Sequence, residues 1–354
     1  MKLSHFLKFS TLSLLISIIA FPSKAEGSCL YSGFEVVEPI LQSELGQIFE
    51  SRTCEDCIIF LADLSGVDLS GGLFNGSDFI ETQFNDTSLV EADLSNTCMT
   101  TVFMLGADLR GANLQNTFFD GVTLSNANLV DVDLSHTRIT GSFENANLSG
   151  ADFTHAQVIA ADFTGADLTN TDFTHASISL AYLINSDLAD ANLNSATFEQ
   201  IIYDPRTRFP ENFSIPQSEA YLFAPYSSVA GVRAYWLNLS GQNLAGLDIS
   251  NSQVIANFSM ATLNQANFEN TNANDSNFTG ANLVGVRFYN SQLRGVNLTD
   301  ANLQAADLRG ADLTRAVIDG TNFQKAIYNE ETTFPEGFDP DTAGAILSDT
   351  PQDA

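Results

Sequence analysis

Apolar residues recur at every fifth position through most of this chain. The segment from Ala301 to Leu313 reads ANLQA ADLRG ADL, and counting back from Leu313 in steps of five meets an apolar residue each time as far as Phe258. Two residues before these centres lies a small or short-branched residue in nearly every unit, and the position between is mostly Asp or Asn. The chain is therefore built from an internal repeat, and such a repeat governs the whole fold.

A period of five fits neither a helix nor an ordinary half-buried strand, whose apolar periods are about 3.6 and 2 residues. We expect each quintet to form one flat side of a coil, with the small residue and the centre pointing inward and a polar turn following. Coils stacked in register would lie about 4.8 Å apart, the spacing of hydrogen-bonded strands. The large centres would then fill the core, and the other inward position would have room only for a small residue.

These repeats, of the form A(D/N)LXX, resemble those of the pentapeptide-repeat family. The resemblance covers most of residues 54–328. It implies an all-β fold, a right-handed quadrilateral parallel β-helix with four quintets per coil.

The register divides the repeats into two lobes. Thirty consecutive apolar centres run from Ile59 to Tyr203, and a second series of 19 begins at Leu239 and ends at Tyr328. We therefore predict lobe 1 over residues 54–203 and lobe 2 over residues 236–328. Each series contains one step of four residues, at Ile139 to Phe143 and at Val254 to Phe258. There we expect a bulge or a tightened corner.

Segments without the repeat are expected to close the coils. Residues 26–53 form a predicted N-terminal cap, because its apolar residues between Ile40 and Phe49 have helical spacing after Pro39. An open coil exposes unpaired strand edges, which such a cap would cover.

A motif at the end of lobe 1 returns 125 residues later. Tyr203–Phe213 corresponds to Tyr328–Phe338, and the equivalent prolines Pro210 and Pro335 each remove a donor from the strand ladder. We predict that both copies are terminators, with residues 204–235 a terminator and connector and residues 329–354 a terminator and tail. The aromatic residues expected over the ends of the core are Phe209, Phe213, Phe334 and Phe338.

The first 25 residues are typical of a secretory signal. Lys2 and Lys8 precede an apolar run from Thr11 to Phe21, and Ser23-Lys24-Ala25 follows. Cleavage after residue 25 would remove three lysines and change the net charge from −29 to −32; an uncleaved anchor is the alternative. No later apolar run is long enough to span a bilayer. We expect export to the periplasm or the extracellular space, or to a thylakoid lumen if the chain is of the cyanobacterial type that the family resemblance suggests.

Four cysteines follow the predicted signal, and an even number in an exported chain favours disulfides. The candidates are Cys29, Cys54, Cys57 and Cys98. Cys54 and Cys57 form a CxxC sequence directly before the first quintets, and similar pairs open many members of the family. A structural staple is favoured over a redox or metal role, and the pairing stays open.

Three histidines occupy equivalent places four quintets apart. Each lies two residues after a centre, so a four-sided coil would stack them at one corner: His136, His155 and His175. Imidazoles at that spacing are candidate zinc or copper ligands. The alternative is a duplicated exposed unit with no metal.

Nothing else in the sequence predicts catalysis. GxSxG, HExxH and phosphate-loop motifs are absent, and the repeat distributes Ser, Thr and acidic residues along faces instead of gathering them in a cleft. We predict no enzyme activity and no cofactor. Eleven aspartates from Asp63 to Asp187 take the outward position before a centre. Interspersed asparagines, including Asn113 and Asn192, should relieve their mutual repulsion.

We therefore predict an exported scaffold or protein-binding module that acts through an acidic, flat-sided surface on an unknown protein partner or on cations. We expect it to bind no nucleic acid. The first alternative, suggested by gyrase-directed members of the family, is a DNA-mimicking topoisomerase binder, and the second is metal binding by the histidines. A partner site is also suggested by aromatic residues that the register places outward, namely Phe103, Phe118, Tyr182, Tyr235 and Trp236.

Overall fold

The computed structural model describes residues 20–21, 35–36, 50–211, 213 and 220–349. A short antiparallel pair, β1 (Ala20–Phe21) and β2 (Glu35–Val36), precedes the solenoid. The predicted signal and most of the predicted helical cap lie outside the described residues, among which only residues 50–51 are helical. Pairing of the coils begins at Thr53, which bridges Leu73.

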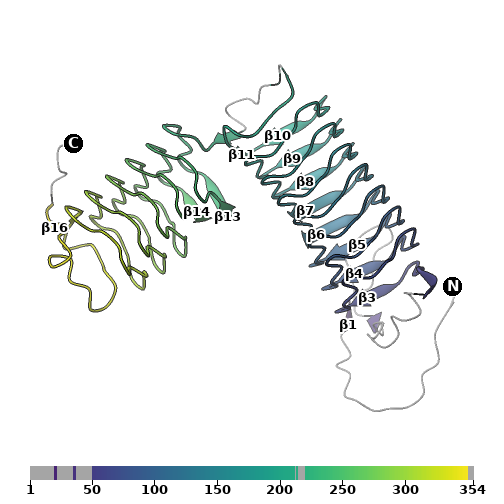
Figure 1. Ribbon diagram of the computed structural model, residues 1–354, viewed down its shortest axis with the longest axis horizontal. Helices are drawn as coiled ribbons and strands as arrows, with labels where there is room; N and C mark the ends of the chain where they lie inside the picture. Colours follow the sequence, from purple (N-terminus) through teal and green to yellow (C-terminus); the bar gives the residue numbers. More distant parts are fainter. Residues whose placement is uncertain (1–19, 22–34, 37–49, 212, 214–219, 350–354) are drawn as a thin grey trace, which may run out of the picture.

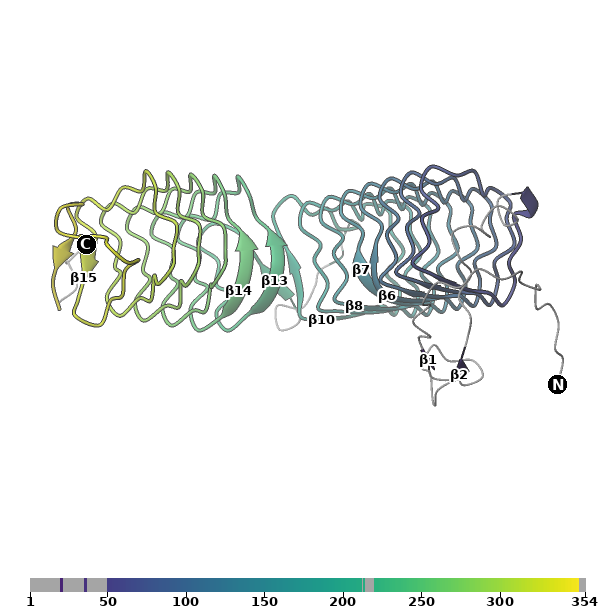
Figure 2. The same cartoon turned by 90° about the horizontal axis from the view of Figure 1, so that it is seen from below.

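Lobe 1 is a four-sided coil of parallel strands. One side is an eight-stranded parallel sheet in the order of the chain, from β3 to β10 (Figures 1 and 2). On the other three sides, isolated parallel bridges join residues one coil apart, such as Asp108 and Asn128. The strands of the sheet are β3 (Ile58–Phe60), β4 (Asp78–Ile80), β5 (Cys98–Thr100), β6 (Phe118–Thr123), β7 (Arg138–Ser142), β8 (Gln157–Ile159), β9 (Ser177–Ser179) and β10 (Thr197–Glu199).

Lobe 2 repeats this architecture with fewer regular strands. Its elements and those of the junction before it are β11 (Ile201–Tyr203), β12 (Ala220–Leu222), β13 (Arg233–Asn238), β14 (Gln253–Asn257), β15 (Ile327–Tyr328) and β16 (Ile346–Leu347). The long axes of the two lobes meet at an angle near β11 to β13, so the molecule is bent (Figure 1).

The centres fill the core as predicted. In lobe 1 all are buried except Leu193 and Tyr203, and in lobe 2 all except Ile318 and Tyr328. These half-buried exceptions lie in the terminal coil of each lobe. Where the small inward residue is Thr or Ser, its hydroxyl donates to a backbone carbonyl, either one coil away, as Thr87 does to Leu64 at 2.7 Å, or three residues earlier in the same coil, as Thr171 does to Leu168 at 2.7 Å. Burial of these hydroxyls is therefore compensated.

The Asp or Asn before each centre is explained by the turn that follows. Its side-chain oxygen accepts a hydrogen bond from the amide two residues on, as Asp152 does from Thr154 at 2.8 Å and Asn147 from Ser149 at 3.1 Å. Asp and Asn stabilise turns in this way because their oxygens reach their own local backbone. Asp78 departs from the predicted solvated position, since it is only 3% exposed.

Side chains at the corners lie over glycines of the next coil. Each corner residue has a positive φ, and a Cβ added to Gly150 would lie 2.3 Å from Oδ1 of Asp131. The same relation joins Tyr226 to Gly246. Glycine is favoured at these positions because it adopts a positive φ without strain and leaves room for the side chain of the preceding coil.

Both short steps produce a bulge in the preceding coil, as predicted. In lobe 1 the pairing of β6 with β7 shifts between Phe119 and Val122, and the extra corner residue is Gly121. In lobe 2 the pairing of β13 with β14 shifts between Tyr235 and Leu237, so the extra residue is Trp236. A coil of normal length opposite a shortened one must leave one residue unpaired.

The two terminators have equivalent structures. Tyr203 contacts Phe209 edge to face, with ring centroids 5.6 Å apart, and Tyr328 contacts Phe334 in the same way at 5.5 Å. Phe209 and Phe213 pack against the core of lobe 1, and Phe334 and Phe338 against that of lobe 2. The aromatic residues therefore cover the core where each run of quintets ends.

The segment predicted as a connector contributes its own coil to lobe 2. Strand β12 pairs in parallel with β11, and Ser228 bridges Asp248. The register of lobe 2 extends back in steps of five to Ala234, Val229 and Ala224, all of which are buried. The sequence obscures this coil because two of its centres are alanines and no Asp or Asn precedes any of the three.

Candidate functional site

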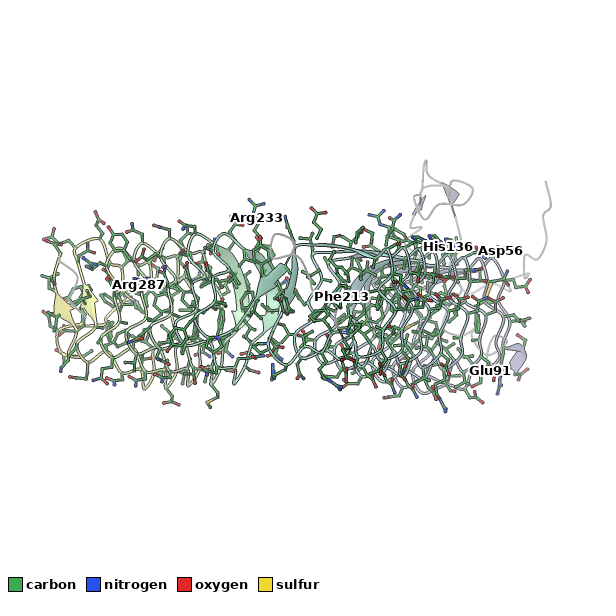
Figure 3. All side chains as sticks on the ribbon, turned by 90° about the horizontal axis from the view of Figure 1, so that it is seen from above. Asp56, Glu91, His136, Phe213, Arg233 and Arg287 are labelled. Carbon is green, nitrogen blue, oxygen red and sulfur yellow. A yellow bond between two sulfur atoms is a disulfide. The ribbon has the colours of Figure 1, made fainter. Side chains whose placement is uncertain are left out.

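The three histidines stack along one corner of lobe 1. Ring centroids of His136 and His155 lie 5.0 Å apart, and those of His155 and His175 lie 5.1 Å apart, with nearly parallel rings. All three residues are exposed and have a φ near 60°. Asp56 lies at the same corner nearer the start of the lobe, and Figure 3 shows it and His136 along one edge. The predicted file is therefore present.

Its geometry does not form a metal centre. Zinc binds imidazole nitrogen at about 2.0–2.1 Å, so two nitrogens on one ion are at most about 4.2 Å apart. Stacked rings hold equivalent nitrogens about 5 Å apart, a separation set by the coil spacing. Among the described residues, no group of three His, Cys, Asp or Glu side chains is arranged to hold an ion. Metal binding would require the rings to rotate and stays a prediction.

The CxxC sequence forms a disulfide at the start of lobe 1. Cys54 is bonded to Cys57, and the Cys54 amide donates to the carbonyl of Leu73 in the next coil. Cys98 is also disulfide-bonded, and no cysteine within the described part of the chain is free. Cys29 lies outside that part. Cys54 is buried and joined to the first coil, which favours the structural role.

A column of acids and amides runs along one face of lobe 1. We call it the acidic ladder; successive coils contribute Asp93, Asn113, Asp133, Asp152, Asp172 and Asn192, joined by parallel bridges. Asn113 donates to Asp93 at 3.3 Å, and Asn192 donates to Asp172 at 3.2 Å, as the predicted relief of repulsion requires. Burial acts to raise the pKa of Asp172, but hydrogen bonds from Thr174 and Asn192 hold that pKa below its usual value. This carboxyl is therefore ionised at neutral pH.

The two lobes differ sharply in charge. Residues 54–203 contain 21 acidic residues and 2 arginines, whereas residues 236–328 contain 7 acidic and 5 basic residues. Most arginines of lobe 2 lie near carboxylates, and Arg309 binds Asp307 at 2.6 Å in a largely buried pair. The negative field of the protein is therefore concentrated on lobe 1.

The predicted outward aromatic residues have different environments. Tyr182 joins the lobes, because its hydroxyl accepts from the amide of Tyr235 at 2.9 Å and donates to the carbonyl of the same residue at 3.1 Å. Phe118 lies beneath the guanidinium of Arg138. Phe103 and Tyr235 are each about two-fifths exposed, and Trp236 is 78% exposed.

Comparison with known proteins identifies the family. The sequence matches the family model described as pentapeptide repeats in 8 copies, over residues 62–100, 105–141, 142–165, 161–200, 256–290 and 291–327, which together span more than half of the chain. The chain belongs to the pentapeptide-repeat family. A search of curated proteins gave no significant sequence match.

Solved structures of other pentapeptide-repeat proteins are similar. HetL, involved in heterocyst differentiation regulation in the cyanobacterium Nostoc, is 19% identical, with 81% of this chain and 96% of HetL covered and a TM-score of 0.41. QnrB1, a plasmid-mediated fluoroquinolone resistance protein, is 18% identical over 48% of this chain and 82% of its own, with a TM-score of 0.28. A protein from the Arabidopsis thaliana thylakoid lumen is 32% identical over 31% of this chain and 66% of its own, with a TM-score of 0.20. At these levels the likeness is one of fold alone.

Within the described residues, no helix is long and apolar enough to cross a bilayer.

Proposed function

We propose that this pentapeptide-repeat protein is an exported, non-enzymatic scaffold that binds a cationic protein surface through the acidic ladder of lobe 1. The repeat fold gives lobe 1 flat sides, and the ladder aligns carboxylates of successive coils along one of them. Complementary charge raises association rates and selects partners of opposite sign.

The observation that carries the proposal is the fixed orientation of the ladder carboxylates. Asp133, Asp152 and Asp172 each accept a hydrogen bond at Oδ1 from the turn amide two residues on, at 2.8–2.9 Å. Their side chains are thus ordered before a partner arrives, so binding costs less side-chain entropy. Asn113 and Asn192 each donate to a neighbouring carboxylate of the ladder, which limits the repulsion between the charges on this face.

Replacement by asparagine tests this role without disturbing the fold. Asn113 and Asn192 already make the same turn bond, so the triple variant Asp133→Asn, Asp152→Asn, Asp172→Asn removes three charges and keeps the local structure. Binding to a labelled decalysine peptide and to basic proteins of the exported compartment is measured against salt concentration. We expect the triple variant to lose at least tenfold in affinity at low salt.

A matched control removes the same charge from lobe 1 at corners that do not adjoin the ladder. Glu81, Asp86 and Asp120 are exposed at such corners. The triple variant Glu81→Gln, Asp86→Asn, Asp120→Asn should change affinity less than threefold. Equal losses in the two triple variants would show that only net charge matters and would refute a role for the ladder.

Export is supported by the signal-like N-terminus and by the disulfides, which persist in oxidising compartments. N-terminal sequencing of protein from the exported fraction should begin at Glu26. Recovery of the uncleaved chain from the cytosol, together with gyrase binding that duplex DNA competes away, would favour the topoisomerase alternative.

A further inference from the structure

One corner of lobe 2 carries two adjoining hollows of about 340 Å³ each. The first is lined in part by Trp236 and Ile255, the second by Arg294, Gly295 and Arg315, and Asp275 belongs to both. We call this row, from Trp236 to Arg315, the corner strip. Backbone hydrogen bonds between successive coils hold it in register, as from Asp275 to Arg294 at 2.9 Å.

Trp236 forms the apolar end of the strip. It is the single tryptophan of the chain, it is 78% exposed, and it holds a φ of 64° as the extra residue of the lobe 2 bulge. The equivalent bulge in lobe 1 is completed by Gly121, so the fold does not need a large side chain there. Positive φ is the ordinary corner conformation of this fold and is shared by Tyr226, so what distinguishes Trp236 is a large exposed aromatic side chain that lines one of the hollows. Such a side chain is available for contact with a partner.

The other end of the strip carries two arginines, Arg294 and Arg315, beside the carboxylate of Asp275, whereas lobe 1 has few basic residues. Arg294 lies 3.8 Å from Asp312. Asp275 lies over Gly295, since a Cβ added there would be 2.6 Å from Oδ1 of Asp275, so this carboxylate lies beside the two arginines. Arg315 is the guanidinium of the strip that has no ion-pair partner among the described residues. Guanidinium groups presented in this way recognise carboxylates with two hydrogen bonds each.

The length of the strip limits its ligand. Four coil steps of about 4.8 Å separate Trp236 from Arg315, or about 19 Å, and an extended peptide advances about 3.3 Å per residue. About six residues therefore span the strip. Because lobe 1 is strongly acidic, long polyanions are repelled, whereas a short segment with one or two carboxylates fits the arginines.

We propose that the corner strip binds an extended peptide segment of a partner protein, with an aromatic or long apolar side chain against Trp236 and a carboxylate on Arg294 and Arg315. This surface goes beyond the proposed function, because its partner has the opposite charge to the one that the acidic ladder selects. The two surfaces lie on different lobes, so the protein is a two-site adaptor.

Selection from a displayed library of random eight-residue peptides tests the strip even while the partner is unidentified. With the mature protein as bait we expect enrichment of peptides that carry an aromatic residue about six positions from Asp or Glu. Emission of Trp236, as the single tryptophan, should shift when a selected tryptophan-free peptide is added. No enrichment, or binding that leaves this emission unchanged, would overturn the proposal.

Variants at each end separate the two contacts. Trp236→Gly keeps the bulge, as Gly121 does in lobe 1, and should weaken a selected peptide at least tenfold and remove the aromatic preference. Arg294→Gln with Arg315→Gln should remove the acidic preference, whereas the control Arg287→Gln, which breaks a pair with Glu269, should change affinity less than twofold. Equal effects of all three changes, or an emission shift caused by oligosaccharide or single-stranded DNA but by no peptide, would refute the assignment.

The acidic-ladder variant should bind the selected peptide with unchanged affinity. Failure of the corner-strip proposal therefore leaves the proposed function of the acidic ladder untouched.

Discussion

The core of lobe 1 should be intolerant of a cavity, and Phe163→Ala tests this directly. Phe163 is 1% exposed and lies between Phe143, with ring centroids 5.1 Å apart, and Phe153, at 6.2 Å. Its amide donates to Tyr182 in the next coil at 2.8 Å. Such bonds hold the coils at a fixed spacing, so the walls are poorly able to collapse into the space that the ring vacates.

The magnitude follows from that rigidity. Phe→Ala in a close-packed core costs about 3–5 kcal/mol, and the cost is larger where the surroundings cannot relax. We expect about 4 kcal/mol for Phe163→Ala. The same column contains Leu183 one coil later, so Phe163→Leu keeps an accepted shape and should cost about 1 kcal/mol.

Urea unfolding followed by circular dichroism measures both free energies, and hydrogen exchange shows whether the loss is centred on neighbouring coils. In a solenoid, each coil contacts only its neighbours, so protection should fall most between residues 143 and 183. An alanine variant within 1 kcal/mol of the parent, or a leucine variant as unstable as the alanine one, would refute the rigid-wall reasoning.

Three further predictions concern residues outside the apolar core. Burial raises the pKa of Asp162, so its carboxylate costs stability above that pKa and costs none in acid, where it is protonated in both the folded and unfolded states. Asp162→Asn should therefore gain on the order of 1 kcal/mol at pH 7 in chemical unfolding, a gain that fades toward pH 4; a gain independent of pH would contradict the assigned cause. Gly150→Ala should cost about 1–2 kcal/mol because of its positive φ and the overlying Asp131. Gly66→Asn, with open space around it, should leave the thermal melting temperature unchanged. Equal losses of stability in the two variants would contradict the role given to the overlying side chain. Calorimetric titration with zinc should show no binding tighter than millimolar; tighter binding that is lost on replacing all three histidines of the stack by asparagine would revive the metal hypothesis.

The fold was predictable because one structural rule is repeated at every coil. Centres such as Leu109 and Leu308 are fully buried, since the period of five admits only one inward arrangement. The stacking of the histidines was predictable because they are four quintets apart, with the short step before Phe143 explaining why His136 and His155 are separated by 19 residues and not 20. Both bulges were expected for the same reason.

Other features depended on side-chain context that the repeat does not encode. The first coil of lobe 2 was missed because its centres, including Ala224, are small and lack a preceding Asp or Asn. The corner strip was missed because Arg294 and Arg315 are 21 positions apart and become neighbours only when the coils stack. The pairing of Cys54 with Cys57 was left open because the sequence does not show which of the four cysteines become neighbours in the fold.

The equivalence of the two terminators includes the strands that follow them, β12 and β16. The amide of Phe223 donates to the carbonyl of Tyr203 at 2.8 Å, and 125 residues later the amide of Ser348 donates to the carbonyl of Tyr328 at the same distance. Strand β16 therefore pairs with the end of lobe 2 as β12, which leads into lobe 2, pairs with the end of lobe 1. Residues 224–348 thus form a modular cassette whose exit matches its entrance. Grafting a second cassette after Ser348 would extend the molecule by another segment with the same bend, giving an arc whose length is set by the number of copies.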